Sequence, residues 1–383
     1  MGYSLQMCGG PYRIPNLRAS GQLVYTNKLR FGAFRGFGNP QVLFPGEQQI
    51  DQIGERLGLD PFEFRRGNLL QPGDGWSVGP RIGSNGLERC LDAAQQATRA
   101  PRADGRPRQL GLAVSAHISG LPGTGAIVRM LDDGTISLNT GATDFGQGSD
   151  TVLAQICAEE LRLPLSHVAV ASPDTDASPF TWGTTASRVT STTGRAHLAV
   201  GGPIMGSDTL VFDEPTHGPK RAIALGLPFP RIGLCSFAAM AVDVDVDPAS
   251  DRVSVAEVWS VADVGRAINP PLVEVQLHGG FVQGLGYALH EEMVWDRARL
   301  ANPPLMDYKV PTARDMPDVI RIGYSIARTG VSPPPPRRRK TPISCGRTGE
   351  HGGRHGTAGR RAPADGIRGL RRPVEPRQYR AHP

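Results

Sequence analysis

The placement of glycine is the feature that most constrains the fold of this 383-residue chain. The sequence contains 48 glycines, and they gather in short clusters instead of recurring at a fixed period. Glycine adopts backbone angles that other residues avoid, and it lets another backbone or a ligand approach closely. The clusters therefore predict many tight turns and close approaches, and the absence of a period excludes a collagen-like chain.

Between the clusters, hydrophobic periodicity predicts both helices and strands. Helices are expected at residues 47–57, at Leu87–Thr98, after Ser149 or Asp150 as N-cap, and at 272–295. In the third helix, Val152, Ile156 and Leu161 are expected on the inner face. Strands are expected at 22–25 and 167–171, and two strand–turn–strand units at 126–139 and 240–261. Such a chain is of the α/β type in the broad sense, and its length is enough for two or three domains.

Positive charge is concentrated near the C-terminus. Residues 329–383 contain 13 Lys and Arg against 3 Asp and Glu, whereas residues 1–328 contain 29 against 33. A basic segment can bind nucleic acid or an acidic membrane surface. Its bias toward Pro, Gly and Arg favours a disordered appendage instead, so nucleic acid is not the expected partner.

The five cysteines are scattered along the chain, and none forms a CxxC pair: Cys8, Cys90, Cys157, Cys235 and Cys345. This spacing disfavours zinc, iron–sulfur and dithiol redox sites within the chain. An odd, scattered set fits a reducing compartment. Because no apolar run approaches the length of a membrane span and the N-terminus has no signal-peptide pattern, a cytoplasmic protein without a membrane partner is expected.

Two glycine-flanked segments are suited to a polar ligand. Residues 141–148 (GATDFGQG) lead from a strand into a helix, where backbone N–H groups can hold an anion. Taken alone, this segment is better interpreted as an ordinary strand–helix turn. Residues 183–194 (GTTASRVTSTTG) are dense in small hydroxyl side chains that offer donors to a polyanionic ligand. A flexible linker is the alternative, but Asp174, Asp176 and Trp182 upstream favour an ordered segment.

Two further segments add amide, guanidinium and aromatic groups. Residues 32–38 (GAFRGFG) place an arginine for an anionic group and aromatics for stacking on a planar substrate, although a tight turn with packed rings is an equal alternative. Residues 263–286 contain Gln276 and Gln283, whose amides can hydrogen-bond a ring-rich cofactor. His278, by itself, is interpreted as a surface histidine of the helix.

Together these four segments, in this order, resemble the large, molybdenum-binding subunit of the xanthine dehydrogenase/aldehyde oxidase family over residues 10–328. Residues 32–38 resemble its AFRGFG loop, 146–148 its GQG, 184–188 a pterin-contacting turn, and 268–292 its INP…QGLGYAL segment. The resemblance implies an α+β fold of two molybdopterin-binding lobes with mixed or antiparallel sheets and packed helices. The implied ranges are 1–79 for the end of the first lobe, 80–107 for a linker, 108–328 for the second lobe and 329–383 for the tail.

The resemblance also implies the site. Seven residues would bind the cofactor, with Arg35 and Gln147 near the molybdenum: Arg35, Gly146, Gln147, Gly148, Ala186, Ser187 and Gln276. Phe37 would stack on the substrate, and Ser115 would line its pocket. No protein side chain would bind the metal directly.

The implied function is a hydroxylase or dehydrogenase subunit that oxidises an aldehyde or an aromatic heterocycle with oxygen from water. Its cofactor would be molybdopterin, as the cytosine dinucleotide, with molybdenum. Because nothing in the chain is spaced to hold iron–sulfur clusters, partner subunits carrying iron–sulfur clusters and FAD are implied.

The sequence departs from the family pattern in three places. The family's N-terminal small domain and its first glycine-rich molybdenum loop are absent from it, residues 197–204 resemble a deletion junction, and the segment from Val331 to Pro383 is unlike any family segment. The family's Gly-Glu-Pro motif, whose glutamate is the general base, does not occur in this sequence. A shifted reading frame is our hypothesis for the C-terminal segment. Since loss of a general base costs on the order of 10²–10⁴-fold in rate, the alternative function is that of an inactive remnant.

Overall fold

The computed structural model describes residues 2–29, 32, 34–76, 82, 84–119, 124–194, 205–210, 234–303 and 306–325. The expected disordered tail (329–383) and the expected deletion junction (197–204) lie outside these residues. Among the described helices, none is both long enough and apolar enough to cross a membrane.

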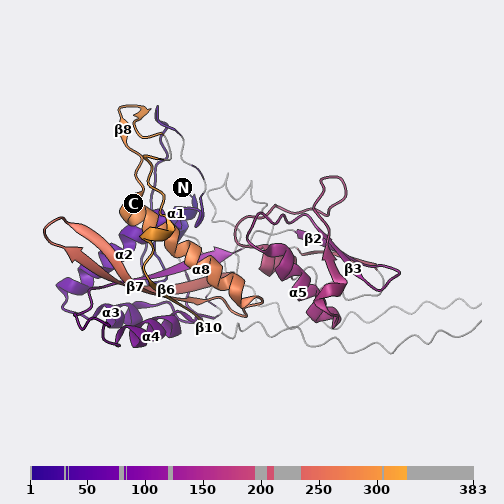
Figure 1. The fold of residues 1–383 in the computed structure, drawn as a ribbon, viewed down its shortest axis with the longest axis horizontal. Helices are drawn as coiled ribbons and strands as arrows, with labels where there is room; N and C mark the ends of the chain where they lie inside the picture. Colours follow the sequence, from indigo (N-terminus) through magenta and orange to yellow (C-terminus); the bar gives the residue numbers. More distant parts are fainter. Residues whose placement is uncertain are drawn as a thin grey trace, which may run out of the picture. The chain divides into compact units, whose positions relative to one another are not determined.

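A four-stranded mixed sheet organises much of the described chain (Figure 1). Its strands, in spatial order, are β1 (Leu110–Ser119), β6 (Leu234–Asp247), β7 (Arg252–Asp263) and β10 (Val319–Ser325). The first three pair antiparallel, and β10 runs parallel to β7. The hairpin of β6 and β7 is one of the two strand–turn–strand units predicted from the sequence.

Helices cover both faces of this sheet because its central strands are apolar on both sides. Ala239 and Ala241 of β6 contribute to the core that includes α4 (Leu87–Thr98). The alternate residues Met240 and Val242 pack with α8 (Pro270–Leu285). Successive side chains of a strand point to opposite faces, so α4 and α8 lie on opposite faces of the sheet, as Figure 1 shows.

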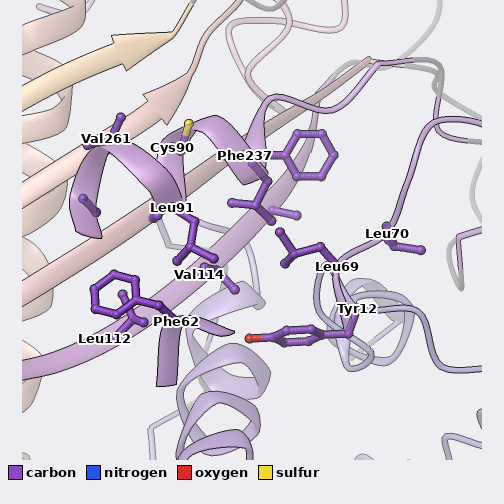
Figure 2. Close-up of a cluster of buried hydrophobic side chains, with 14 of the residues drawn as sticks. Tyr12, Phe62, Leu69, Leu70, Cys90, Leu91, Leu112, Val114, Phe237 and Val261 are labelled. Atoms are coloured by element: carbon purple, nitrogen blue, oxygen red, sulfur yellow. The ribbon is translucent and has the colours of Figure 1, made fainter. Parts of the chain in front are cut away.

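The N-terminal helices α1 (Gly2–Met7), α2 (Asn39–Arg56) and α3 (Pro61–Asn68) complete this core. Figure 2 shows Tyr12, Phe62 and Leu69 from the N-terminal region gathered with Leu112 and Val114 of β1. A polar network lies beside these apolar side chains. Arg65 is fully buried and forms ion pairs with Glu47 and Asp51.

A second sheet has the order β4 (Val168–Val170), β3 (Ile136–Thr140), β2 (Thr124–Met130) and β5 (Met205–Leu210). The β3–β4 pair is parallel and the others are antiparallel. Helix α5 (Ser149–Leu161) packs on it through Leu153 and Cys157, which form a separate core with Ile136 and Leu138. The predicted α+β fold with mixed and antiparallel sheets is confirmed.

Shorter elements connect these parts. They are the 3-10 helices η1 (Leu165–His167) and η4 (Ala313–Asp315), the π-helical turns η2 (Val189–Thr193) and η3 (Gly286–His290), and the small hairpin of β8 (Trp295–Asp296) and β9 (Arg299–Leu300).

Several local predictions need correction. Residues 22–25 form no strand, and Tyr25 is fully exposed. The helix predicted at 272–295 ends at His290, because the chain becomes extended at Glu291. Gly148, not Ser149 or Asp150, is the N-cap of α5, and Leu153 replaces Val152 and Leu161 among its buried residues. The α3 helix was missed, although Asp60 caps it and Pro61 begins it, as is common at helix starts.

The segment 80–107, expected to be a linker, contains α4, and Leu87, Cys90 and Leu91 of that helix are fully buried. Residues from 1–79, α4, β1, β6 and β7 all share one hydrophobic core. The expected boundaries at 79/80 and 107/108 therefore do not separate two cores. The reason is that the amphipathic face of α4 is buried against β6 and β7.

Candidate functional site

The GATDFGQG segment forms a tight loop closed by Asp144. The Asp144 carboxylate accepts hydrogen bonds from the backbone N–H groups of Gly146 (2.9 Å), Gly148 (3.3 Å) and Asp150 (3.0 Å). Gly146 and Gly148 have φ angles of +111° and +82°, which favour glycine. The Gln147 side chain folds back on this loop, where its Oε1 accepts from Phe145 N and its Nε2 donates to Ser149 Oγ.

Asp144 gives a pH-dependent prediction. Burial opposes ionisation, but the backbone N–H groups of Asp150, Gly146 and Gly148 outweigh it, so the pKa of Asp144 is lowered. A lowered pKa in the folded state stabilises the fold above the unfolded pKa, and this contribution is lost as pH falls through the folded value. We expect Asp144→Asn, which removes a negative charge at the start of α5, to lower the free energy of unfolding by about 0.3–1 kcal/mol at pH 7 and to lose less stability than wild type on acidification below about pH 4.

Urea unfolding at pH 7 and at pH 3 measures both effects. The exposed Glu160 on α5 supplies the matched control, Glu160→Gln. Equal acid sensitivity of Asp144→Asn and wild type would contradict the assigned role of Asp144.

The hydroxyl-rich segment forms a turn attached to this loop through Thr184. Thr184 Oγ1 accepts from Thr143 N (2.8 Å) and donates to Thr143 O (2.7 Å). Ala186 and Ser187 follow with φ angles of +53° and +52°, so two consecutive residues with side chains occupy the left-handed region. Such strain costs of order 1–3 kcal/mol per residue and is concentrated at functional sites. The buried Arg188 anchors the turn by donating to Gly183 O.

Ser187 contacts β1 through a histidine. Its Oγ lies 3.1 Å from His117 Nε2, and the other ring nitrogen of His117 lies 3.1 Å from Asn39 Nδ2. The Tyr3 ring contacts both the His117 ring and the half-exposed Phe37 ring, with centroids 6.0 and 5.6 Å apart. Ser115 is two residues before His117 on β1, so both side chains point to the same face.

The arginine of the GAFRGFG loop contacts α8. Arg35 Nη2 donates to the backbone O and the side-chain Oε1 of Gln276, at 2.7 and 2.9 Å. Gln283 Nε2 donates to Arg35 O at 3.4 Å. A Cβ at Gly279 would lie 3.2 Å from Arg35 Nη1, so the glycine makes room for the guanidinium. Two residues implied by the resemblance, Arg35 and Gln276, are therefore direct partners.

The start of α8 lies against the GQG loop. A Cβ at Gly148 would be only 2.6 Å from Leu272 Cδ1, so this approach requires glycine. Asn269 caps α8 by accepting from Leu272 N, and its Nδ2 donates to Gln155 Oε1 on α5. Contacts thus connect all four sequence segments: the GQG loop, the hydroxyl turn, the GAFRGFG loop and α8.

Other residues of these segments have local roles. Asp263 accepts from Gly86 N at the start of α4, and His278 contacts Glu274 O within α8. The sequence analysis did not identify His117 or Asn39, and it gave no individual role to Asp144 or Thr184. Of these four residues, only Asp144 has a local sequence pattern that indicates its role, because an Asp shortly before glycines is typical of a turn that its side chain closes. The other three act through contacts distant in sequence, which no local pattern encodes.

The assembled groups are suited to an organic ligand rich in hydrogen-bonding atoms. They provide a guanidinium, side-chain amides, hydroxyls and the exposed rings of Phe34, Phe37 and Phe145. Within the described ranges, no group of three or more His, Cys, Asp or Glu side chains is arranged to hold a metal ion. Burial raises the pKa of Cys90 and of Cys235 to about 12, so neither thiol readily forms a thiolate ligand.

Known proteins resemble this chain in both sequence and fold. Models of a molybdopterin cofactor-binding domain match residues 1–69 and residues 87–205 with 221–317. The xanthine dehydrogenase molybdenum-binding subunit of Escherichia coli O157:H7 is 34% identical over 83% of this chain and 50% of its own length. Subunit gamma of the 6-hydroxypseudooxynicotine dehydrogenase complex of Paenarthrobacter nicotinovorans is 30% identical over 81% and 46%.

The structure of the aldehyde oxidoreductase from Desulfovibrio gigas superposes with a TM-score of 0.73 at 26% identity, covering 84% of this chain and 39% of that chain. The chain spans about half the length of the curated relatives named above. It belongs to the xanthine dehydrogenase/aldehyde oxidoreductase family of molybdopterin-binding subunits.

Proposed function

We propose that the chain binds molybdopterin with molybdenum at the four connected segments and serves as the cofactor-binding part of a hydroxylase that oxidises an aldehyde or an aromatic heterocycle. The observation that carries this proposal is the set of contacts that joins the four segments around Arg35, Gln276, Thr184 and Ser187. These segments are far apart in sequence, so their contacts make a common ligand site the simplest account.

Each site residue has a proposed role. Arg35 and Gln147 lie nearest the metal, and Gly146 and Gly148 shape the loop that presents Gln147. Ala186, Ser187 and Gln276 contact the pterin or its phosphates. Phe37 stacks on the substrate, and Ser115 lines the substrate pocket. The half-exposed ring of Phe37 supports its role, since an aromatic side chain that is not buried can receive a planar ligand.

The cofactor and the protein divide the chemistry. When bound, molybdopterin supplies a redox-active molybdenum, which the protein itself does not coordinate. The chain holds the cofactor by hydrogen bonds and positions the substrate. The cytosine dinucleotide form, partner subunits with iron–sulfur clusters and FAD, and a cytoplasmic location complete the proposal. The scattered cysteines support the partner subunits, because their spacing does not suit an iron–sulfur cluster. They also support the cytoplasmic location, because they do not require an oxidising compartment.

The experiment that tests this proposal is expression of the full chain in a host that synthesises molybdopterin. We expect bound molybdenum and a pterin that is released by denaturation, and mass spectrometry of the released compound identifies its nucleotide. Arg35→Met should retain about tenfold less molybdenum, since a hydrogen bond to a charged group contributes about 1.5–3 kcal/mol. Arg129→Met, an exposed arginine on β2, is the matched control and should retain the wild-type amount. A wild-type chain without molybdopterin would contradict the proposal.

We propose as the alternative function that of an inactive remnant of this family. In this case the chain binds the cofactor but does not turn over. Molybdenum-loaded protein, reconstituted with iron–sulfur and flavin partners, distinguishes the two functions by its reduction with aldehydes and heterocycles. Reduction by any of these substrates would contradict the second function.

A further inference from the structure

The orientation of the Asn39 side-chain amide can be assigned from its surroundings. Asn39 is buried, and its Nδ2 lies 3.0 Å from the backbone carbonyl oxygen of Ala116. A carbonyl oxygen only accepts hydrogen bonds, so the atom facing it must be the amide nitrogen. The same Nδ2 lies 3.1 Å from His117 Nδ1.

This amide determines which nitrogen of His117 carries a proton. An amide nitrogen only donates, so Nδ1 must accept and therefore lacks a proton. A neutral histidine has its proton on the other nitrogen, which here is Nε2. The Tyr3 hydroxyl does not alter this assignment, because it donates to Ile118 O at 3.1 Å and lies 3.4 Å from Nδ1. Burial lowers the pKa of His117, which favours the neutral ring.

The protonated Nε2 in turn fixes the direction of the Ser187 hydroxyl. Because Nε2–H donates to Ser187 Oγ over 3.1 Å, the hydroxyl proton cannot point at the histidine. Ser187 is exposed, and its backbone is held in the left-handed region. Its proton is thus available to an acceptor outside the protein.

We propose that Asn39 and His117 are positioning residues that hold Ser187 as a hydrogen-bond donor to an acceptor oxygen or nitrogen of the bound ligand. This inference rests on the proposed function for the identity of the ligand, but the Asn39–His117–Ser187 relay itself is a property of the protein alone. It predicts that an acceptor atom of the bound ligand lies within hydrogen-bond distance of the Ser187 hydroxyl.

The first test measures which ring nitrogen of His117 is protonated, and it needs no cofactor. In the full chain with ¹⁵N-labelled histidine, the signals of His117 are identified by their loss in His117→Gln. We expect wild type to be protonated on Nε2 only. In Asn39→Asp a carboxylate oxygen replaces the donor, so Nδ1 should gain a proton, while the signals of the exposed His167 stay unchanged. A wild-type His117 that is protonated on Nδ1, or identical His117 spectra in wild type and Asn39→Asp, would overturn the relay.

The second test measures molybdenum retained after gel filtration by the full chain expressed in a molybdopterin-producing host. His117→Gln keeps an amide donor near the Nε2 position and should remain within about twofold of wild type. His117→Leu and Ser187→Ala each remove one hydrogen bond and should retain roughly threefold to tenfold less. His167→Gln is the control, and circular dichroism verifies that each variant is folded.

The outcomes separate the two proposals. If wild type retains no molybdenum, the proposed function fails, and the tautomer measurement still decides the relay. If wild type is loaded and Ser187→Ala retains just as much, the ligand contact at Ser187 is overturned. If His117→Leu is unfolded, the molybdenum content of His117→Gln and Ser187→Ala relative to wild type still decides whether Ser187 contacts the ligand.

Discussion

Replacing Arg65 by methionine is expected to lower the free energy of unfolding by about 3–5 kcal/mol. The guanidinium is fully buried, where it contacts Glu47 at 3.0 Å, Asp51 at 2.7 Å and the backbone oxygen of Leu112 at 2.8 Å. Burial opposes the charged form, but Glu47, Tyr12 and Asp51 together outweigh it and raise the pKa of Arg65. The methionine variant would leave the Glu47 carboxylate buried without its cation, which is the costly outcome of breaking such a pair.

The next residue in the sequence provides the control. Arg66 also forms two ion pairs, but its partners Glu63 and Asp92 have side chains that are 60% and 55% exposed. Ion pairs at the surface contribute about 0–1 kcal/mol, so Arg66→Met should cost no more than about 1 kcal/mol. Urea unfolding of both variants compares them directly. Equal losses of stability in Arg65→Met and Arg66→Met would show that burial of the pair is unimportant.

Gly148→Ala is expected to destabilise the protein by about 2–5 kcal/mol and to deplete it of molybdenum. Two costs combine here. A left-handed backbone costs a residue with a side chain roughly 1–2 kcal/mol, and overpacking costs about 1–3 kcal/mol. The added methyl group would meet Leu272 Cδ1 at 2.6 Å and push α8 away from the GQG loop. Thermal unfolding and molybdenum content measure the two consequences.

Gly146 separates backbone strain from the steric clash. Its φ angle is also positive, at +111°, but a Cβ there would meet nothing within 4 Å. Gly146→Ala should therefore show the backbone cost alone, about 1–3 kcal/mol. Combining Gly148→Ala with Leu272→Ala should recover the steric part, which a double-mutant cycle reports as a coupling energy. A coupling energy near zero would rule out the Leu272 contact as the cause.

The resemblance identified the segments of the site but not how they meet. Arg35 and Gln276 were both expected at the cofactor, and they form a direct hydrogen-bonded pair. Gln147 stays a proposed neighbour of the metal, and its amide is hydrogen-bonded within its own loop. His117 and Asn39 carried no signal, because an isolated histidine on a strand has no local pattern that indicates a distant partner.

The fold was predictable where a local pattern repeats. The periodic apolar residues of α4 predicted Leu87–Thr98 with both ends correct, since its buried face follows a helical spacing. The local pattern gave a wrong strand at residues 22–25, because residues with a high propensity for strands form one only when another strand pairs with them. It also extended α8 into residues 291–295, where the helical pattern continues but the backbone becomes extended.

The sequence by itself determined the helices and strands with strong periodicity, the tight turns at glycine clusters and the family. The helices, strands and turns depend on interactions between residues that are close along the chain. The family is identified by short sequence motifs. Only the tertiary structure decided that residues from 1–79 share a core with β6 and β7, that Gly148 meets Leu272, and that Ser187 reaches Asn39 through His117. Ser187 and His117, for example, are 70 positions apart in the sequence. Such contacts arise from the packing of distant elements, which no local spacing encodes.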